Sequence, residues 1–194
     1  MIGFSIAAPV GPIGVLCIRR TLASGRAAGL ASGLGAATAD AFYGAIAGFG
    51  LTFVSQLLIS HQAWLRLVGG GFLCYLGVKT FLSRPATVGA AAREGGLPGA
   101  YGTTFLLTLT NPLTIISFAA IFAGLGLGGA SGRYLGATAL VGGVFLGSAA
   151  WWLALTGAVS VFRARIDGRG LRSVNRISGA IITAFGLLAF LSLL

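Results

Sequence analysis

The stretch IAAPVGPIGVLCIRR, residues 6–20, is apolar enough to lie in a membrane, yet it carries Pro9 and Pro12 together with Gly11 and Gly14. Each proline removes a helix hydrogen bond and presses against the preceding turn, so a soluble core helix would not tolerate this pair. A membrane helix tolerates such a break where the freed peptide groups line a cavity instead of lipid. The stretch therefore predicts a broken transmembrane helix of the kind that transporters use.

Composition extends this interpretation to the whole chain. Of its 194 residues, 56% are hydrophobic and only 8% are charged, and the mean hydropathy is +0.96. Soluble domains are usually about 25% charged, so this composition excludes a soluble protein. The long continuous apolar runs exclude an outer-membrane barrel. The net charge of +10 would suggest a nucleic-acid partner for a soluble protein. Here the arginines lie at the ends of apolar runs, and no nucleic-acid partner is expected.

The apolar runs predict an all-α integral membrane protein, with the lipid bilayer as its surroundings. At about 20 residues per span plus short connections, the length suits about six transmembrane helices in one domain, residues 1–194. We expect the spans at about 2–18, from the end of SGRAAG to 58, 64–82, 101–125, 134–162 and 177–194. Residues 83–100 are expected to be a flexible connector, and residues 163–176 a basic loop.

The distribution of basic residues predicts the orientation of the chain. The connections after the first, third and fifth spans hold eleven of the 13 lysines and arginines, whereas only Arg66 and Arg133 lie on the other side. Basic residues concentrate on the cytoplasmic side of multi-pass membrane proteins. Both termini are therefore expected to face away from the cytoplasm.

The two halves of the chain, 1–82 and 101–194, resemble each other. GPIGVLCIRRTLASG with Pro12 is matched by NPLTIISFAAIFAGL with Pro112, and RLVGGGFLCYLGVKTFL is echoed by RISGAIITAFGLLAFL. GLGAATADAF has a loose counterpart in GVFLGSAAWW. Since each copy holds three spans, the copies lie in opposite orientations, and such an inverted 3+3 repeat is typical of secondary transporters. Chance similarity between glycine-rich segments is the alternative.

Asp40 is the main candidate for chemistry. It is one of three acidic residues, and the other two, Glu94 and Asp167, lie in basic connections. Asp40 follows Arg26 by 14 residues, about 20 Å along a helix, where a carboxylate costs about 3 kcal/mol unless it faces a cavity or a partner. It could bind a substrate ammonium group or carry the proton that drives transport. Alternatively, it only hydrogen-bonds to a neighbouring span; the repeat sets Ser148 opposite it.

Two proline breaks form the rest of the predicted site. Pro12 and Pro112 each break a span near its middle, in the first and the fourth helix, and Gly11 and Asn111 ease the break. The freed peptide groups can meet a polar ligand, and a helix N-terminus after each proline favours a carboxylate. With Asp40 for an ammonium group, the breaks fit a zwitterionic amino acid. The alternative is that the prolines only kink helices for packing.

Trp151 is the remaining candidate for substrate binding. It lies with Trp152 deep in the fifth span, on the segment that the repeat sets opposite Asp40. An indole ring there could line the cavity or cover an ammonium group through a cation–π contact. Core packing is the alternative for both tryptophans.

The sequence resembles the LysE-type amino-acid exporter family over nearly its whole length. The motifs that carry the resemblance are GPIG in the first span, SGRAAGLASGLGAATAD leading into the second and NPLT in the fourth. It implies an amino-acid exporter of the bacterial inner membrane, driven by the membrane potential or the proton gradient and working as a homodimer. The functional positions that it implies are Gly11, Pro12, Asp40, Asn111 and Pro112.

Three alternatives to an amino-acid exporter stay open at this point. An exporter of another solute such as a metal cation would need ligands, and the spans offer no histidine, one carboxylate and two isolated thiols, Cys17 and Cys74. An intramembrane enzyme would need a nucleophile–base pair or a metal cluster, and the only histidine, His61, lies at a loop edge. A structural membrane partner would not need Asp40. No cofactor is expected.

Overall fold

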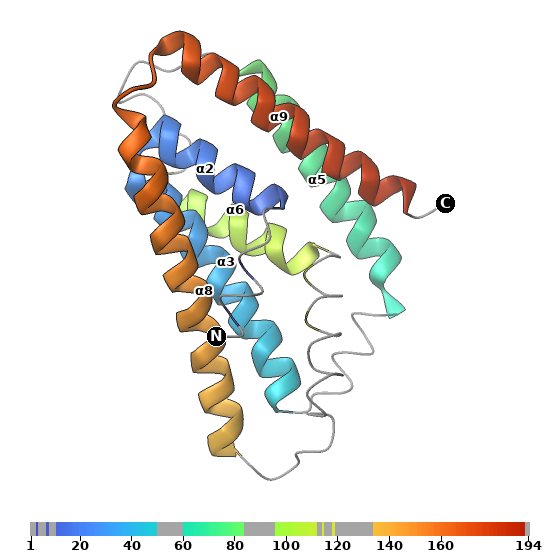
Figure 1. Ribbon diagram of the computed structural model, residues 1–194. Coiled ribbons are helices and arrows are strands. Elements are labelled where there is room, and N and C mark those ends of the chain that lie inside the picture. Colours follow the sequence, from blue (N-terminus) through green and yellow to red (C-terminus); the bar gives the residue numbers. More distant parts are fainter. Residues whose placement is uncertain are drawn as a thin grey trace.

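The computed structural model describes residues 3, 7, 11–49, 60–83, 96–111, 114, 118 and 134–192. In this part of the chain the regular structure is entirely helical (Figure 1). The helices are α2 (Pro12–Ser24), α3 (Arg26–Gly48), α5 (Gln62–Leu82), α6 (Gly96–Thr110), α8 (Tyr134–Arg163) and α9 (Gly168–Leu191). The predicted fold class is thus confirmed as all-α.

Three of the helices are long and apolar enough to cross a membrane: Ala63–Leu82 in α5, Leu135–Arg163 in α8 and Gly168–Leu191 in α9. The α5 and α8 segments confirm the predicted third and fifth spans. α3 has 23 residues, but its many small and polar side chains lower its hydropathy. α2 and α6, with 13 and 15 residues, are shorter than the roughly 20 residues that a full span needs.

The helices form two antiparallel pairs, with α2 and α6 between them (Figure 1). α3 packs along α8, and α5 packs along α9. α2 lies at the centre, because it packs against α3 and α8 on one side and against α9 on the other, while α6 packs along α3. The central position of α2 brings the start of this helix into the interior of the bundle.

Glycines allow α5 and α9 to approach closely. A Cβ atom on Gly77 would lie 2.9 Å from the carbonyl oxygen of Gly179 and 2.6 Å from the backbone nitrogen of Thr183. Two helical turns away, a Cβ on Gly186 would lie 2.8 Å from the carbonyl oxygen of Gly70. These neighbours are helix backbone atoms, which cannot move aside. Small residues at regular spacing are what membrane helices use for close crossings.

Substitution of Gly77 by alanine is expected to lower stability by about 1–3 kcal/mol, because the new methyl group overfills the α5–α9 contact. The thermal unfolding temperature of the detergent-purified protein measures the effect. Gly71→Ala is the matched control, because among the described residues its Cβ would meet only the Phe190 ring, at 3.8 Å. Equal unfolding temperatures for the two variants would show that the Gly77 contact is not tight.

The end of α2 differs from the prediction. The apolar run predicts a first span that ends at Ile18, with Arg19 and Arg20 in a connection, but the helix continues to Ser24. The expectation was wrong because both guanidinium groups find hydrogen-bond partners on neighbouring helices instead of facing water. The start of this span before Gly11, apart from residues 3 and 7, lies outside the described residues.

Two helix starts also differ from the expected boundaries. α9 begins at Gly168, inside the predicted loop 163–176, because the carboxylate of Asp167 caps it by accepting a hydrogen bond from the Gly170 nitrogen at 2.7 Å. α6 begins at Gly96, inside the predicted connector 83–100. The expected end of the second span, residues 50–58, lies outside the described residues.

Candidate substrate site

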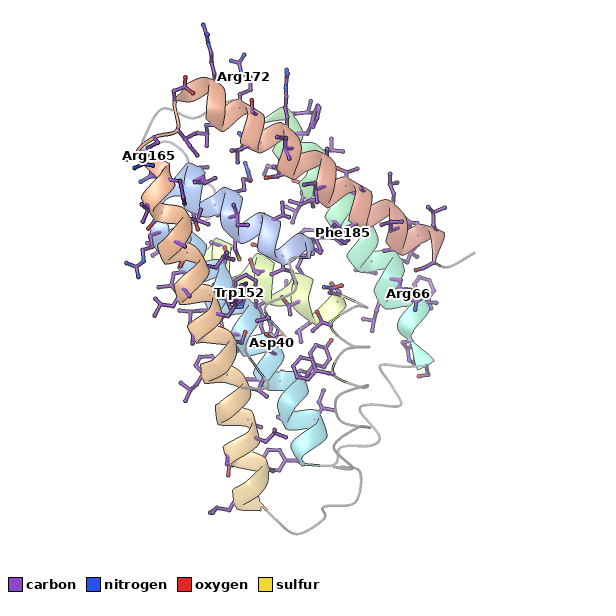
Figure 2. All side chains as sticks on the ribbon, in the orientation of Figure 1. Asp40, Arg66, Trp152, Arg165, Arg172 and Phe185 are labelled. Atoms are coloured by element: carbon purple, nitrogen blue, oxygen red, sulfur yellow. The ribbon has the colours of Figure 1, made fainter. Side chains whose placement is uncertain are left out.

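Asp40 lies in the interior, between α3 and α8 (Figure 2). Its side chain is only 4% exposed, and its Oδ2 atom accepts a hydrogen bond from Ser148 Oγ at 2.7 Å. Ser148 Oγ in turn accepts one from Trp152 Nε1 at 3.1 Å. The two helices can bring these groups together because Gly33 of α3 packs directly against the side chain of Trp152. The partner that the repeat set opposite Asp40 is thus its hydrogen-bond donor.

The direction of these hydrogen bonds defines what Asp40 can still bind. The single hydroxyl proton of Ser148 goes to Asp40, and an oxygen lone pair of Ser148 receives the indole proton. Both hydrogen bonds point toward the carboxylate, and each one polarises and strengthens the other. In the described part of the protein, Oδ1 has no hydrogen-bond donor, and no lysine or arginine forms an ion pair with Asp40. The carboxylate can therefore take a proton or a cationic group.

The break at Gly11 lies close to this network. α2 begins at Pro12, and Gly11 precedes it in an extended conformation with φ −97° and ψ −167°. Gly11, the N-cap residue, makes no side-chain hydrogen bond to the first turn, and a Cβ on Gly11 would meet no atom of the described residues within 4 Å. Ile13 shares a buried apolar cluster with Ala37 and Trp152. The start of α2 therefore lies beside the network, with space at Gly11 that no described residue fills.

The predicted break at Asn111 lies near α3, the helix that carries Asp40. α6 ends at Thr110, and Asn111 is not helical. Tyr43, one turn after Asp40, donates its hydroxyl to the carbonyl oxygen of Leu109 at 2.6 Å. This carbonyl is in the last turn of α6, where carbonyls have no partner within the helix. The predicted site residue Pro112 lies outside the described residues.

The two neighbouring tryptophans have different positions. Trp152 is 4% exposed and joins the Asp40 network, whereas Trp151 is half-buried and packs against the edge of the apolar cluster. The sequence predicts Ser148 only as a residue opposite Asp40, and leaves core packing as the alternative to a cavity role for Trp152. The spacing of Ser148 and Trp152 is a signal that could have found this pair, because residues four apart share one helix face.

Arg20 is a residue whose role the sequence analysis missed. Its Nη1 atom donates to Ser32 Oγ at 2.8 Å, to the Ala100 carbonyl at 2.9 Å and to Thr104 Oγ1 at 2.8 Å. Its Nη2 atom donates to Thr103 Oγ1 at 2.7 Å. Arg20 thus joins α2 to α3 and α6 through neutral oxygens, and in the described chain no carboxylate pairs with it. A part-buried guanidinium group needs such partners to offset the loss of water.

Arg20→Ala is expected to destabilise the bundle by about 2–4 kcal/mol, since hydrogen bonds to a charged group contribute about 1.5–3 kcal/mol each and do not add fully. Thermal unfolding in detergent measures the loss. Arg26→Ala is the control, because Arg26 is an exposed arginine at the start of α3. If both variants unfold at one temperature, the Arg20 contacts do not hold the helices together.

These features define a class of protein. The described bundle has long apolar helices and close glycine crossings, and α2 begins directly after Gly11 and α6 ends directly before Asn111. A buried carboxylate, that of Asp40, lies among these helices. This combination is that of a multi-pass membrane transporter. Among the described residues, no group of three or more His, Cys, Asp or Glu could hold a metal ion.

The chain belongs to the LysE type translocator family, which it matches over residues 4–192. The resemblance found in the sequence motifs is thereby confirmed. Proteins of this family are transporters and not enzymes, so the intramembrane enzyme alternative is excluded.

Two relatives cover most of the chain. The first, from Bacillus subtilis (strain 168), is named "Putative amino acid efflux protein YcgF" and is 28% identical over 191 residues, which are 96% of this chain and 90% of the relative. The second, from Escherichia coli (strain K12), is named "Uncharacterized membrane protein YahN" and is 31% identical over 175 residues, 88% of this chain and 77% of the relative. No solved structure matches this chain.

Proposed function

We propose that the protein is a secondary-active exporter of amino acids or closely related small metabolites across the bacterial inner membrane, coupled to the proton gradient or the membrane potential. The observation that carries this proposal is the buried carboxylate of Asp40, with one oxygen held by Ser148 and the other without a donor in the described chain. The name of the Bacillus subtilis relative as an amino acid efflux protein supports the substrate class.

The two charged ends of an amino acid suit two different parts of the proposed site. The ammonium group binds to Oδ1 of Asp40. The carboxylate group binds to the first peptide N–H groups of α2, just after Gly11 and Pro12, because these groups have no partner within the helix and a helix N-terminus carries partial positive charge. Asn111 and Pro112 at the second break, and Trp151 beside the cluster, complete the proposed contacts.

Asp40 also carries the proposed proton coupling. The same carboxylate oxygen cannot hold a proton and an ammonium group at once, so the two exchange on one atom. Proton binding from the outer side would then release the amino acid there, and proton release to the cytoplasm would prepare Asp40 for the next substrate. This exchange at a single buried acid is the simplest coupling that one intramembrane carboxylate allows.

The proposed architecture is an inverted 3+3 repeat of residues 1–82 and 101–194, with both termini on the outer, periplasmic side. Two observations support the repeat: α3 runs antiparallel to α8, and α5 runs antiparallel to α9, and each pair joins helices at matching places in the two halves. The excess of basic residues on one side supports the orientation.

Efflux of labelled amino acids from preloaded cells tests the proposed function. Cells that make the protein should lose one or a few amino acids faster than cells with an empty vector. A proton uncoupler should remove the difference. If the two kinds of cell release every amino acid at the same rate, the amino-acid assignment is wrong and the substrate lies outside this class.

A further inference from the structure

A cavity lies where the end of α5 meets the start of α9. Its volume is about 510 Å³, and it is lined by the last residues of α5 and two arginines of α9. The lining residues are Phe81, Leu82, Ser83, Arg172 and Arg176. This cavity is separate from the Asp40 network, since none of its lining residues takes part in that network.

The charge around the cavity is positive. Arg172 and Arg176 are four residues apart in α9 and therefore lie on one face of the helix. Both are exposed, and in the described chain neither guanidinium group has a hydrogen-bond or ion-pair partner. Arg19 of α2 adds a third guanidinium group at the rim, where its Nη2 atom lies 3.5 Å from Ser83 Oγ. Among the described residues that line the cavity, none is acidic.

The cavity lies at the ends of two candidate spans, Ala63–Leu82 and Gly168–Leu191. The ends of transmembrane helices lie near the boundary between lipid headgroups and acyl chains. Figure 2 shows Arg172 extending beyond the bundle at the same end as Arg165. Beside the arginines, apolar side chains face outward: Phe81 is 44% exposed, Leu82 71% and Ile177 61%. The arginines and the exposed apolar side chains thus adjoin, as the charged headgroup and the acyl chains of a phospholipid do.

We propose that this cavity is a binding site for one anionic phospholipid. Arg172 and Arg176 hold the phosphate oxygens of the headgroup, for which the planar guanidinium fork is well suited. The acyl chains lie along Phe81, Leu82 and Ile177. Basic pockets between transmembrane helices on the cytoplasmic side are suited to such headgroups. A bound lipid would bridge α5 and α9 at the end of their glycine crossing and stabilise this pair.

Lipid binding to the detergent-purified protein tests the site. Native mass spectrometry compares a phosphatidylglycerol with a phosphatidylcholine of the same acyl chains, each with the wild type and with the Arg172→Gln/Arg176→Gln double variant. We expect one retained phosphatidylglycerol on the wild type. The double variant should bind it about twenty-five-fold more weakly, because each arginine near an anionic lipid contributes a factor of about five.

A matched control separates a site from general attraction. Arg165→Gln/Arg169→Gln removes the same charge from the same end of the protein, but neither residue lines the cavity. This control should bind phosphatidylglycerol as the wild type does. Equal weakening in both double variants, or equal retention of the two lipids, would overturn the proposal. Displacement of the lipid by millimolar inorganic phosphate would overturn it too, because the site would then be one for a free anion.

Discussion

Asp40→Asn is expected to abolish efflux and to leave the protein folded. Asparagine has the shape of aspartate, and its amide oxygen can still accept the hydrogen bond from Ser148. It has no negative charge for an ammonium group and no carboxylate to carry a proton. Loss of one partner of a buried charge pair costs about 2 kcal/mol or more, so the efflux rate should fall at least about thirtyfold. The efflux assay on preloaded cells measures this rate.

The control for this variant is Asp167→Asn. Asp167 is the other described aspartate, and it caps α9 outside the Asp40 network. Its substitution should lower stability slightly, by about 1 kcal/mol at most, because asparagine is itself a good cap, and should not change efflux. Thermal unfolding of the purified variants excludes loss of fold as a cause. Wild-type efflux by a folded Asp40→Asn protein would leave Asp40 a structural role only.

The sequence predicted the long spans and the Asp40 position because both depend on strong local signals. Continuous apolar runs predict α5 and α8 almost to the residue, since little else can bury so much apolar surface. A lone carboxylate in such a run must meet a partner. The comparison of the two halves pointed to Ser148 because matching residues of antiparallel helices can meet where the helices cross.

The role of Arg20 could not be predicted from local pattern. An arginine at the end of an apolar run normally marks the membrane surface. The oxygens that hold Arg20 belong to Ser32 on α3 and to Thr103 and Thr104, which are 83 and 84 residues further along the chain. Only the packed bundle brings these groups together. Hydropathy therefore ended the first helix too early.

The choice between Trp151 and Trp152 depended on helix rotation, which composition does not give. Successive residues of an α-helix point about 100° apart, so only one of two adjacent tryptophans can face α3. Gly33, which offers the space against Trp152, decides which one. The position of Ser148, four residues before Trp152, would have favoured Trp152 over Trp151, because residues four apart share one helix face.

Gly11→Leu is expected to block efflux without unfolding the protein. The backbone at Gly11, with φ −97° and ψ −167°, is open to any residue, and a Cβ there meets no atom of the described residues within 4 Å. A leucine side chain would therefore fit in the space in front of α2, which we propose that the substrate carboxylate occupies. Efflux should fall about tenfold or more, because overfilling a packed site costs about 1–3 kcal/mol.

The matched control for Gly11→Leu is Gly142→Leu on α8. A Cβ built on Gly142 would also meet no atom of the described residues within 4 Å, but Gly142 takes no part in the Asp40 network. Both variants should unfold near the wild-type temperature, and only Gly11→Leu should lose efflux. Such a difference separates occupied substrate space from general crowding of the bundle. If Gly11→Leu exports at the wild-type rate, the substrate does not pass the start of α2, and the carboxylate half of the proposed site is wrong.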